Sequence, residues 1–184
     1  MVNLADEPSL IDASRRGDTE AFAVLIGRFQ RMIHALTFRM SGSEADAADL
    51  AQEVFVQAWR RIDGFRGDAK FSSWLYRIGV NTCLNWRKTQ QMEAHARIRW
   101  SESVVADNPA GDADRSLLVQ EALMKLPAKQ RAAVVLTTYD GMNHAEAARF
   151  LGCSEATVSW RVFVARTKLK RWLNPQVSKK GIKA

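Results

Sequence analysis

The chain has 184 residues, of which 47% are hydrophobic, and it carries a formal net charge of +7. This apolar content excludes a chain that is disordered throughout, and no apolar run approaches the roughly 20 residues needed to cross a bilayer. The N-terminus shows neither a basic leader nor an apolar signal segment, so the sequence predicts a cytoplasmic protein without membrane insertion.

The first half of the chain is expected to form a helical module. A short helix near 9–16 precedes a long helix at 20–40, in which apolar residues recur at three- and four-residue steps. These apolar residues are Phe22, Leu25, Ile26, Phe29, Met32, Ile33 and Leu36.

Two more helices complete the expected module. The first, at 43–62, begins with Ser43 as a capping residue and has Asp46 in its first turn. Two glycines within residues 63–68 then predict a shaped loop, and the next helix follows at about 70–91. The expected core residues are Leu50, Ala51, Val54, Phe55, Ala58, Trp59 and Ile62 in the first of these helices and Phe71, Trp74, Leu75 and Ile78 in the second.

Residues 93–114 lose this pattern. The segment is acidic and contains Pro109 and Gly111, which predicts a flexible tether. The helical pattern returns at residue 115, and one helix is expected to end at Pro127 and the next, from Ala128 to about residue 140, at Gly141. Their apolar positions are Leu117, Leu118, Ala122, Leu123, Leu126, Val134, Val135 and Leu136.

Residues 144–173 form a helix-turn-helix pattern, with a short helix at 144–151 and a longer one at 155–173. Gly152 supplies the left-handed conformation of the turn, and Ser154 can cap the second helix. Small and apolar residues at the helix crossing are Ala147, Ala148, Val158 and Val162. An ordinary helical hairpin would share these features, but the basic face beside them favours DNA binding.

The positive charge is concentrated in the last third of the chain. Residues 1–92 carry a net charge of +1, residues 93–114 carry −3, and residues 115–184 carry +9. A basic, solvated tail explains only Lys179, Lys180 and Lys183. The remaining excess is expected for a segment that binds a polyanion.

Three stretches resemble conserved parts of one family. Residues 46–61 and 65–82 closely resemble region 2 of the extracytoplasmic-function sigma factors of bacterial RNA polymerase, particularly the envelope-stress branch, and 115–173 resembles region 4. The resemblance implies an all-α fold of two small helical domains joined by a flexible linker. The implied division is region 2 at 1–92, a linker at 93–114, region 4 at 115–175 and a basic tail at 176–184.

The resemblance also implies a role in transcription initiation. Such a factor directs the polymerase core to promoters, binds the −35 element as duplex and melts the −10 element. The implied partners are the core enzyme, through the clamp helices of its largest subunit and its flap, promoter DNA, and an anti-sigma factor. The residues implied in contact with the core are Asp49, Leu50, Gln52, Glu53, Phe55 and Trp59. For Phe55 and Trp59, core packing remains an equally open alternative, because their four-residue spacing suits both roles.

Recognition of the −10 element requires a pocket that replaces base stacking. We expect Tyr76 to project away from the apolar face of its helix, toward an exposed base or the backbone. Trp74, by contrast, belongs to the core stripe. The candidate residues for the −10 element are Phe65, Arg66, Gly67, Asp68, Ala69, Tyr76, Asn81, Trp86, Arg87 and Lys88.

The −35 element is implied to contact the second helix of the helix-turn-helix. The candidate residues are Ser154, Glu155, Thr157, Ser159, Trp160, Arg161, Phe163, Arg166 and Lys168. Arg161 is the strongest of them, whereas Trp160 departs from the small residue usual in the family. The −35 sequence therefore cannot be transferred from a relative.

The residues provide no basis for a cofactor, metal or enzyme activity. Cys83 and Cys153 form no CxxC motif, and His34, His95 and His144 have no metal-binding spacing. One alternative is a self-sufficient helix-turn-helix regulator whose N-terminal helices dimerise. A second is a helical enzyme or adaptor with an incidental basic tail. Strong sequence-specific DNA binding without polymerase would favour the regulator.

Overall fold

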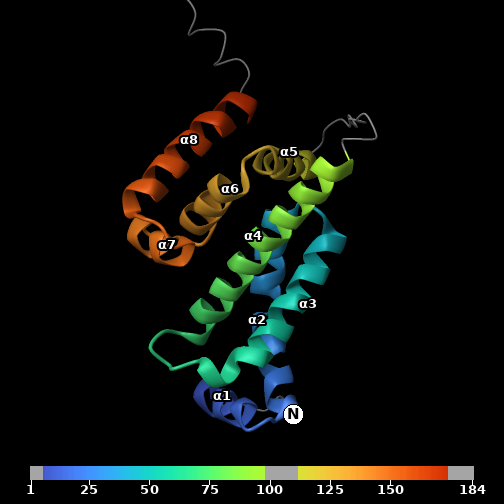
Figure 1. Cartoon of the computed structure of the whole chain (residues 1–184), viewed down its shortest axis with the longest axis vertical. Coiled ribbons are helices and arrows are strands. Elements are labelled where there is room, and N and C mark those ends of the chain that lie inside the picture. Colours follow the sequence, from blue (N-terminus) through green and yellow to red (C-terminus); the bar gives the residue numbers. More distant parts are fainter. Residues whose placement is uncertain (1–5, 98–111, 174–184) are drawn as a thin grey trace, which may run out of the picture. The chain divides into compact units, whose positions relative to one another are not determined.

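The computed structural model describes residues 6–97 and 112–173, which form helices and turns without a strand (Figure 1). The expected all-α class is therefore confirmed. The chain divides into two compact units, which we describe separately: the first contains residues up to 38 and residues 43–83, and the second contains residues 39–42 and those from 84 onward. None of the helices in the described ranges has the length and apolar character of a membrane span.

The first unit is built from α1 (Glu7–Arg15), α2 (Thr19–Ser41), α3 (Glu44–Arg61) and the first half of α4 (Phe71–Arg97). All four helices were expected, but α4 continues past 91 into the segment predicted as a tether. Its buried core joins residues of all four helices and of the turn Ile62–Gly64 (η1). The largest contributions come from Phe22, Leu25, Ile33, Val54, Phe55, Phe71, Leu75 and Ile78.

Local interactions explain where α3 begins and how its end leads into α4. The Ser43 hydroxyl accepts a hydrogen bond of 3.3 Å from the backbone N–H of Asp46, which confirms the predicted cap. After η1, the rings of Phe65, Phe71 and Trp74 pack together with centroid distances of 5.4 to 5.5 Å. This aromatic cluster attaches the loop to the start of α4.

The second unit contains α5 (Asp112–Met124), α6 (Ala128–Val134), a π-helical turn at Val135–Tyr139 (η2), α7 (His144–Leu151) and α8 (Glu155–Leu173). Leu117 and Leu118, two of the apolar positions that mark the predicted helix, are 55% and 48% exposed. The buried residues of α5 are Ala122 and Leu123, Val119 is partly buried against the same cluster, and Leu126 joins it just after the helix ends.

A fully buried arginine stabilises the end of α5. Arg131, in α6, donates hydrogen bonds to the carbonyls of Leu123 (2.7 Å), Met124 (2.7 Å) and Leu126 (3.1 Å). These carbonyls lie at the C-terminal end of α5, where helix geometry leaves acceptors without a partner in the helix. Burial lowers the pKa of Arg131 to about 10, so the side chain remains a cation at neutral pH.

The two thiols of the chain differ in accessibility, which gives a first testable prediction. Cys83 is fully buried in α4, and its burial raises the pKa of the thiol to about 12, whereas Cys153 is half-buried in the turn before α8. Since the thiolate is the reactive form, iodoacetamide at pH 8 should label Cys153 and spare Cys83 in the folded protein. Peptide mass spectrometry of native and urea-unfolded samples checks this. Equal labelling of both cysteines in the native sample would contradict the buried position of Cys83.

Candidate protein-binding and nucleic-acid interfaces

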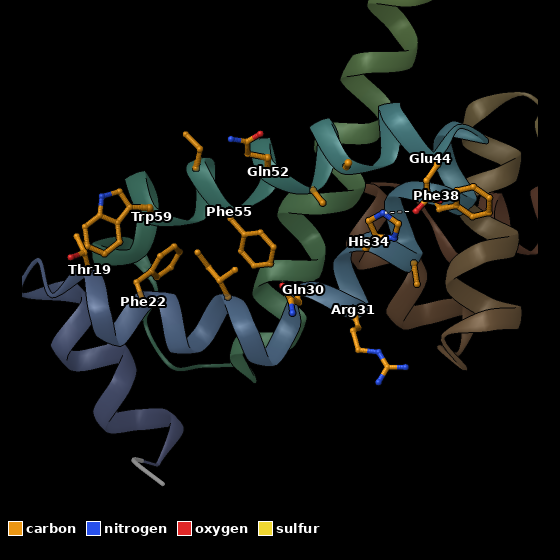
Figure 2. A pocket seen from close by; sticks show the side chains of 15 residues that line it. Thr19, Phe22, Gln30, Arg31, His34, Phe38, Glu44, Gln52, Phe55 and Trp59 are labelled. Carbon is orange, nitrogen blue, oxygen red and sulfur yellow. Dashed lines mark ion pairs between the residues drawn. The ribbon is translucent and has the colours of Figure 1, made fainter. Parts of the chain in front are cut away.

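An apolar groove of about 1010 Å³ runs between α2 and α3 in the first unit. Figure 2 shows the rings of Phe22, Phe55 and Trp59 between the two helices, and the Phe22 and Trp59 ring centroids lie 5.0 Å apart. Farther along, His34 Nε2 lies 3.3 Å from Glu44 Oε1. The groove is lined by Thr19, Phe22, Ile26, Gln30, Arg31, His34, Ala35, Phe38, Glu44, Ala48, Ala51, Gln52, Phe55, Val56 and Trp59.

The residues expected to contact the polymerase core divide into three groups. Gln52, Phe55 and Trp59 line the groove, so the two aromatic residues both pack in the unit and face this space. Asp49 and Glu53 are exposed on α3 outside the groove lining, and Leu50 is buried. Sequence analysis missed the wall contributed by α2. Ile26 of α2 lines the groove, but in the sequence it is only one of the regularly spaced apolar residues. Periodicity does not show which of these residues remain partly exposed.

The loop expected to recognise the −10 element is exposed except for its first residue. Phe65 is 7% exposed and its ring meets Phe71 edge-on, so it packs in the unit, and it also lines a cleft beside the loop. Its part in a base pocket stays a prediction. Gly67 has a φ of 78°, which a residue with a Cβ rarely adopts. The loop forms one side of a cleft of about 230 Å³ whose other side belongs to α1, a contribution that sequence analysis missed.

The candidates on α4 differ in accessibility. Tyr76 is only 5% exposed, so the prediction that it projects away from the apolar face is wrong: the buried side of α4 is wider than the stripe of three- and four-residue steps. Asn81 and Lys88 are exposed. Trp86 and Arg87 are half-buried, and the guanidinium carbon of Arg87 lies 5.8 Å from the Trp86 ring centroid.

The predicted helix-turn-helix is present in the second unit. Asn143 and Glu146 form a reciprocal capping box at the start of α7, in which each side chain accepts a backbone N–H bond of 2.9 Å. Gly152 adopts the left-handed conformation at φ 59° and ψ 42°, as expected. The Ser154 hydroxyl then accepts a hydrogen bond of 3.2 Å from the N–H of Thr157 and caps α8.

Buried small and apolar residues fix the crossing of the two helices. Ala147 and Ala148 of α7 and Val158 and Val162 of α8 are all buried, as the sequence predicted. Small side chains on α7 allow α8 to approach closely, and the valines fill the space between them. The opposite side of α8 is therefore held outward on a rigid support.

Several polar candidates on α8 have partners within the unit. His144 Nδ1 and Ser159 Oγ are 2.7 Å apart, and Arg161 Nη1 lies 3.4 Å from Cys153 Sγ. Ser159 and Arg161 are accordingly half-buried, while Ser154, Glu155, Trp160 and Phe163 are exposed.

Arg166 and Lys168, the basic candidates farther along α8, also differ in exposure. Arg166 is exposed and its Nη2 lies 3.5 Å from Thr138 Oγ1. Lys168 is half-buried, and its Nζ donates to Gln130 Oε1 at 3.3 Å. The exposed cations farther along α8 are Lys170 and Arg171.

Family models match both parts of the chain. The model described as Sigma-70 region 2 matches residues 25–93, which include most of α2, all of α3 and most of α4. The model described as Sigma-70, region 4 matches residues 116–169, which include the helix-turn-helix.

Individual relatives match most of the chain. It is 37% identical to the ECF RNA polymerase sigma factor SigM of Mycobacterium tuberculosis (strain H37Rv) over 91% of this chain and 84% of that protein. It is 32% identical to the ECF RNA polymerase sigma-E factor of Escherichia coli (strain K12) over 91% of this chain and 94% of that protein. Among solved structures, the sigma factor RpoE of Bartonella quintana, crystallised with the anti-sigma factor NepR, matches with a TM-score of 0.68 and 26% identity, covering 84% of this chain and 98% of that one.

Proposed function

The chain belongs to the extracytoplasmic-function sigma factors of RNA polymerase, the subunits that direct the enzyme to specific promoters, and on this premise we propose how its surfaces divide that task. The single observation that carries the proposal is the capped helix-turn-helix, because it presents a rigid cationic helix in a unit separate from the apolar groove.

The groove between α2 and α3 is the proposed contact with the polymerase core. An open apolar groove of this size on a small domain is typical of a docking site for another protein. Gln52 lies within it, and the exposed carboxylates of Asp49 and Glu53 lie nearby on α3, so polar contacts can orient a helical partner over the apolar floor. We assign this surface to the clamp helices of the largest subunit.

The loop after η1 and the exposed side of α4 are the proposed −10 surface. Arg66, Gly67 and Asp68 offer a cation, an uncovered backbone and a carboxylate to a flipped base, while Asn81 and Lys88 are exposed on α4. Releasing a base from the stack costs ~3 kcal/mol, which such contacts must offset. Promoter opening then proceeds through binding energy, and this chain makes or breaks no bond.

Helix α8 is the proposed −35 surface. It carries five basic residues and one acidic residue, and its N-terminal half follows the turn as the recognition helix of a helix-turn-helix does. Because the −10 and −35 contacts belong to one chain, binding of either raises the effective concentration of the other. Dissociation from a promoter then requires both contacts to break.

An anti-sigma factor is the proposed regulatory partner. The matched RpoE structure from Bartonella quintana contains the anti-sigma factor NepR. The apolar groove of this chain is the surface on which such a protein gains most, because covering it removes apolar area from water and blocks the proposed polymerase contact.

Run-off transcription with core polymerase tests the proposed function. The full chain should give the core enzyme a defined set of start sites on a library of promoter fragments. Arg161→Ala should reduce initiation about tenfold on −35-dependent fragments while the protein still co-purifies with core polymerase. A gel shift without polymerase is the control. Sequence-specific binding there, together with no start-site selection by the holoenzyme, would replace this function with that of a self-sufficient regulator.

A further inference from the structure

The outward side of α8 is apolar where the proposed −35 contact begins. Ala156, Trp160 and Phe163 follow one another at spacings of four and three residues, which places them on one face of the helix. All three are exposed, Trp160 by 59% and Phe163 by 70%. Exposing two large aromatic rings to water on a small folded unit is unfavourable. The pair therefore indicates a surface that contacts another molecule.

Three polar candidates of the same half-helix have partners within their own unit. Ser159 is engaged with His144 at 2.7 Å, and Arg161 approaches the sulfur of Cys153 at 3.4 Å. Thr157 Oγ1 lies 2.8 Å from Ser154 Oγ. The largest exposed side chains in this half of α8 are therefore the two aromatic rings.

The charge of α8 identifies the class of partner that covers these rings. Beyond the aromatic pair the helix exposes Arg166, Lys170 and Arg171, and Glu155 is its one acidic residue. An apolar patch beside a row of cations is complementary to a duplex, in which phosphates flank the apolar groups of the base edges.

Thymine is the base that presents such an apolar group. Its C5-methyl projects into the major groove, where none of the other three bases carries a methyl group. Trp160 and Phe163 are separated by about 4.5 Å along the helix axis, close to the roughly 3.4 Å between successive base pairs. Two rings at this spacing can meet methyl groups on neighbouring pairs.

We propose that Trp160 and Phe163 recognise thymine methyl groups at neighbouring positions of the −35 element. This proposal rests on the proposed function of α8 and specifies the chemistry by which it selects a sequence. It assigns part of the specificity to apolar contact, beside the contact proposed for Arg161.

A selection experiment provides the first test. The library keeps the −10 segment of a promoter found by run-off transcription and randomises the −35 window upstream of it. Holoenzyme made from the full chain then selects the duplexes that it binds. The wild-type chain should enrich thymine at adjacent positions of one strand. Trp160→Ser and Phe163→Ala, which alter exposed side chains, should fold normally by circular dichroism and lose that enrichment.

Replacing the enriched thymines with deoxyuridine provides the decisive test, since it removes the methyl and leaves every hydrogen-bonding group in place. Wild-type holoenzyme should bind about fourfold more weakly for each methyl removed. The Trp160→Ser/Phe163→Ala variant should bind both duplexes equally. Arg166→Ala serves as the comparison: it should weaken binding to both duplexes by the same factor, as loss of a phosphate contact does.

The possible outcomes distinguish a failure of the methyl contact from a failure of the proposed −35 function of α8. A selected −35 sequence that wild-type holoenzyme binds equally with thymine or deoxyuridine would overturn the methyl contact and leave α8 as the −35 helix. Unchanged selection by the aromatic variants would likewise overturn it and assign the rings to a protein partner. A randomised window without any selected sequence would remove the −35 function of α8 itself.

Discussion

Replacement of Arg131 with methionine should lower the free energy of unfolding of the second unit by about 3 kcal/mol. Methionine keeps the apolar length of the side chain but donates no hydrogen bond. The carbonyls of Leu123, Met124 and Leu126 would then lose the donor that satisfies them at the end of α5. Each buried acceptor without a partner costs about 1 kcal/mol or more.

Urea unfolding followed by circular dichroism measures this change, with Lys129→Met as the matched control. Lys129 lies on the same short helix but is exposed, so its replacement should change stability by less than about 0.5 kcal/mol. Arg131→Lys should also destabilise, because one ammonium group cannot span three carbonyls as a planar guanidinium does. Equal unfolding midpoints for Arg131→Met and Lys129→Met would show that the hydrogen bonds of Arg131 contribute nothing to stability.

The role of Arg131 also marks a limit of inference from sequence. Helix positions followed from apolar periodicity, and helix ends followed from Ser43, Gly152 and Ser154, because these signals act through neighbours in the chain. Arg131 gave no such signal. Arginine is usually a surface residue, and its burial here depends on carbonyls five to eight residues away and on that of Met40, which become adjacent only when the helices pack.

In the candidate sites, too, features set by neighbours in the chain could be predicted, whereas features set by the packing of helices could not. The recognition helix could be located from its sequence, but the inward turn of Ser159 and Arg161 depends on α7 and on the turn before α8. Phe65 was implied as a DNA contact by the resemblance to region 2, and Tyr76 by its expected projection from the apolar face of its helix, whereas both side chains are buried. The candidate contact residues on α3 could be predicted from the sequence. The groove itself could not, because it forms only where α2 packs beside α3.

Placing a carboxylate in that groove should abolish most of the affinity for core polymerase. Ala48 lies on α3, is exposed and lines the groove, so Ala48→Asp leaves the core of the unit intact. When the polymerase covers the groove, the new charge must be taken out of water without a partner. A cost of about 2 kcal/mol or more corresponds to a loss of about 30-fold or more in affinity.

Ala45→Asp is the matched control, because Ala45 is an exposed alanine of the same helix that does not line the groove. Both variants add one negative charge near the start of α3, so any long-range attraction to the polymerase changes nearly equally. Fluorescence anisotropy of labelled chain titrated with core polymerase compares them directly. A large loss of affinity for core polymerase in Ala48→Asp, with no loss in Ala45→Asp, would show that the groove is buried in the complex. Equal affinities for the two would place the polymerase contact elsewhere on the first unit and leave the groove to the anti-sigma factor.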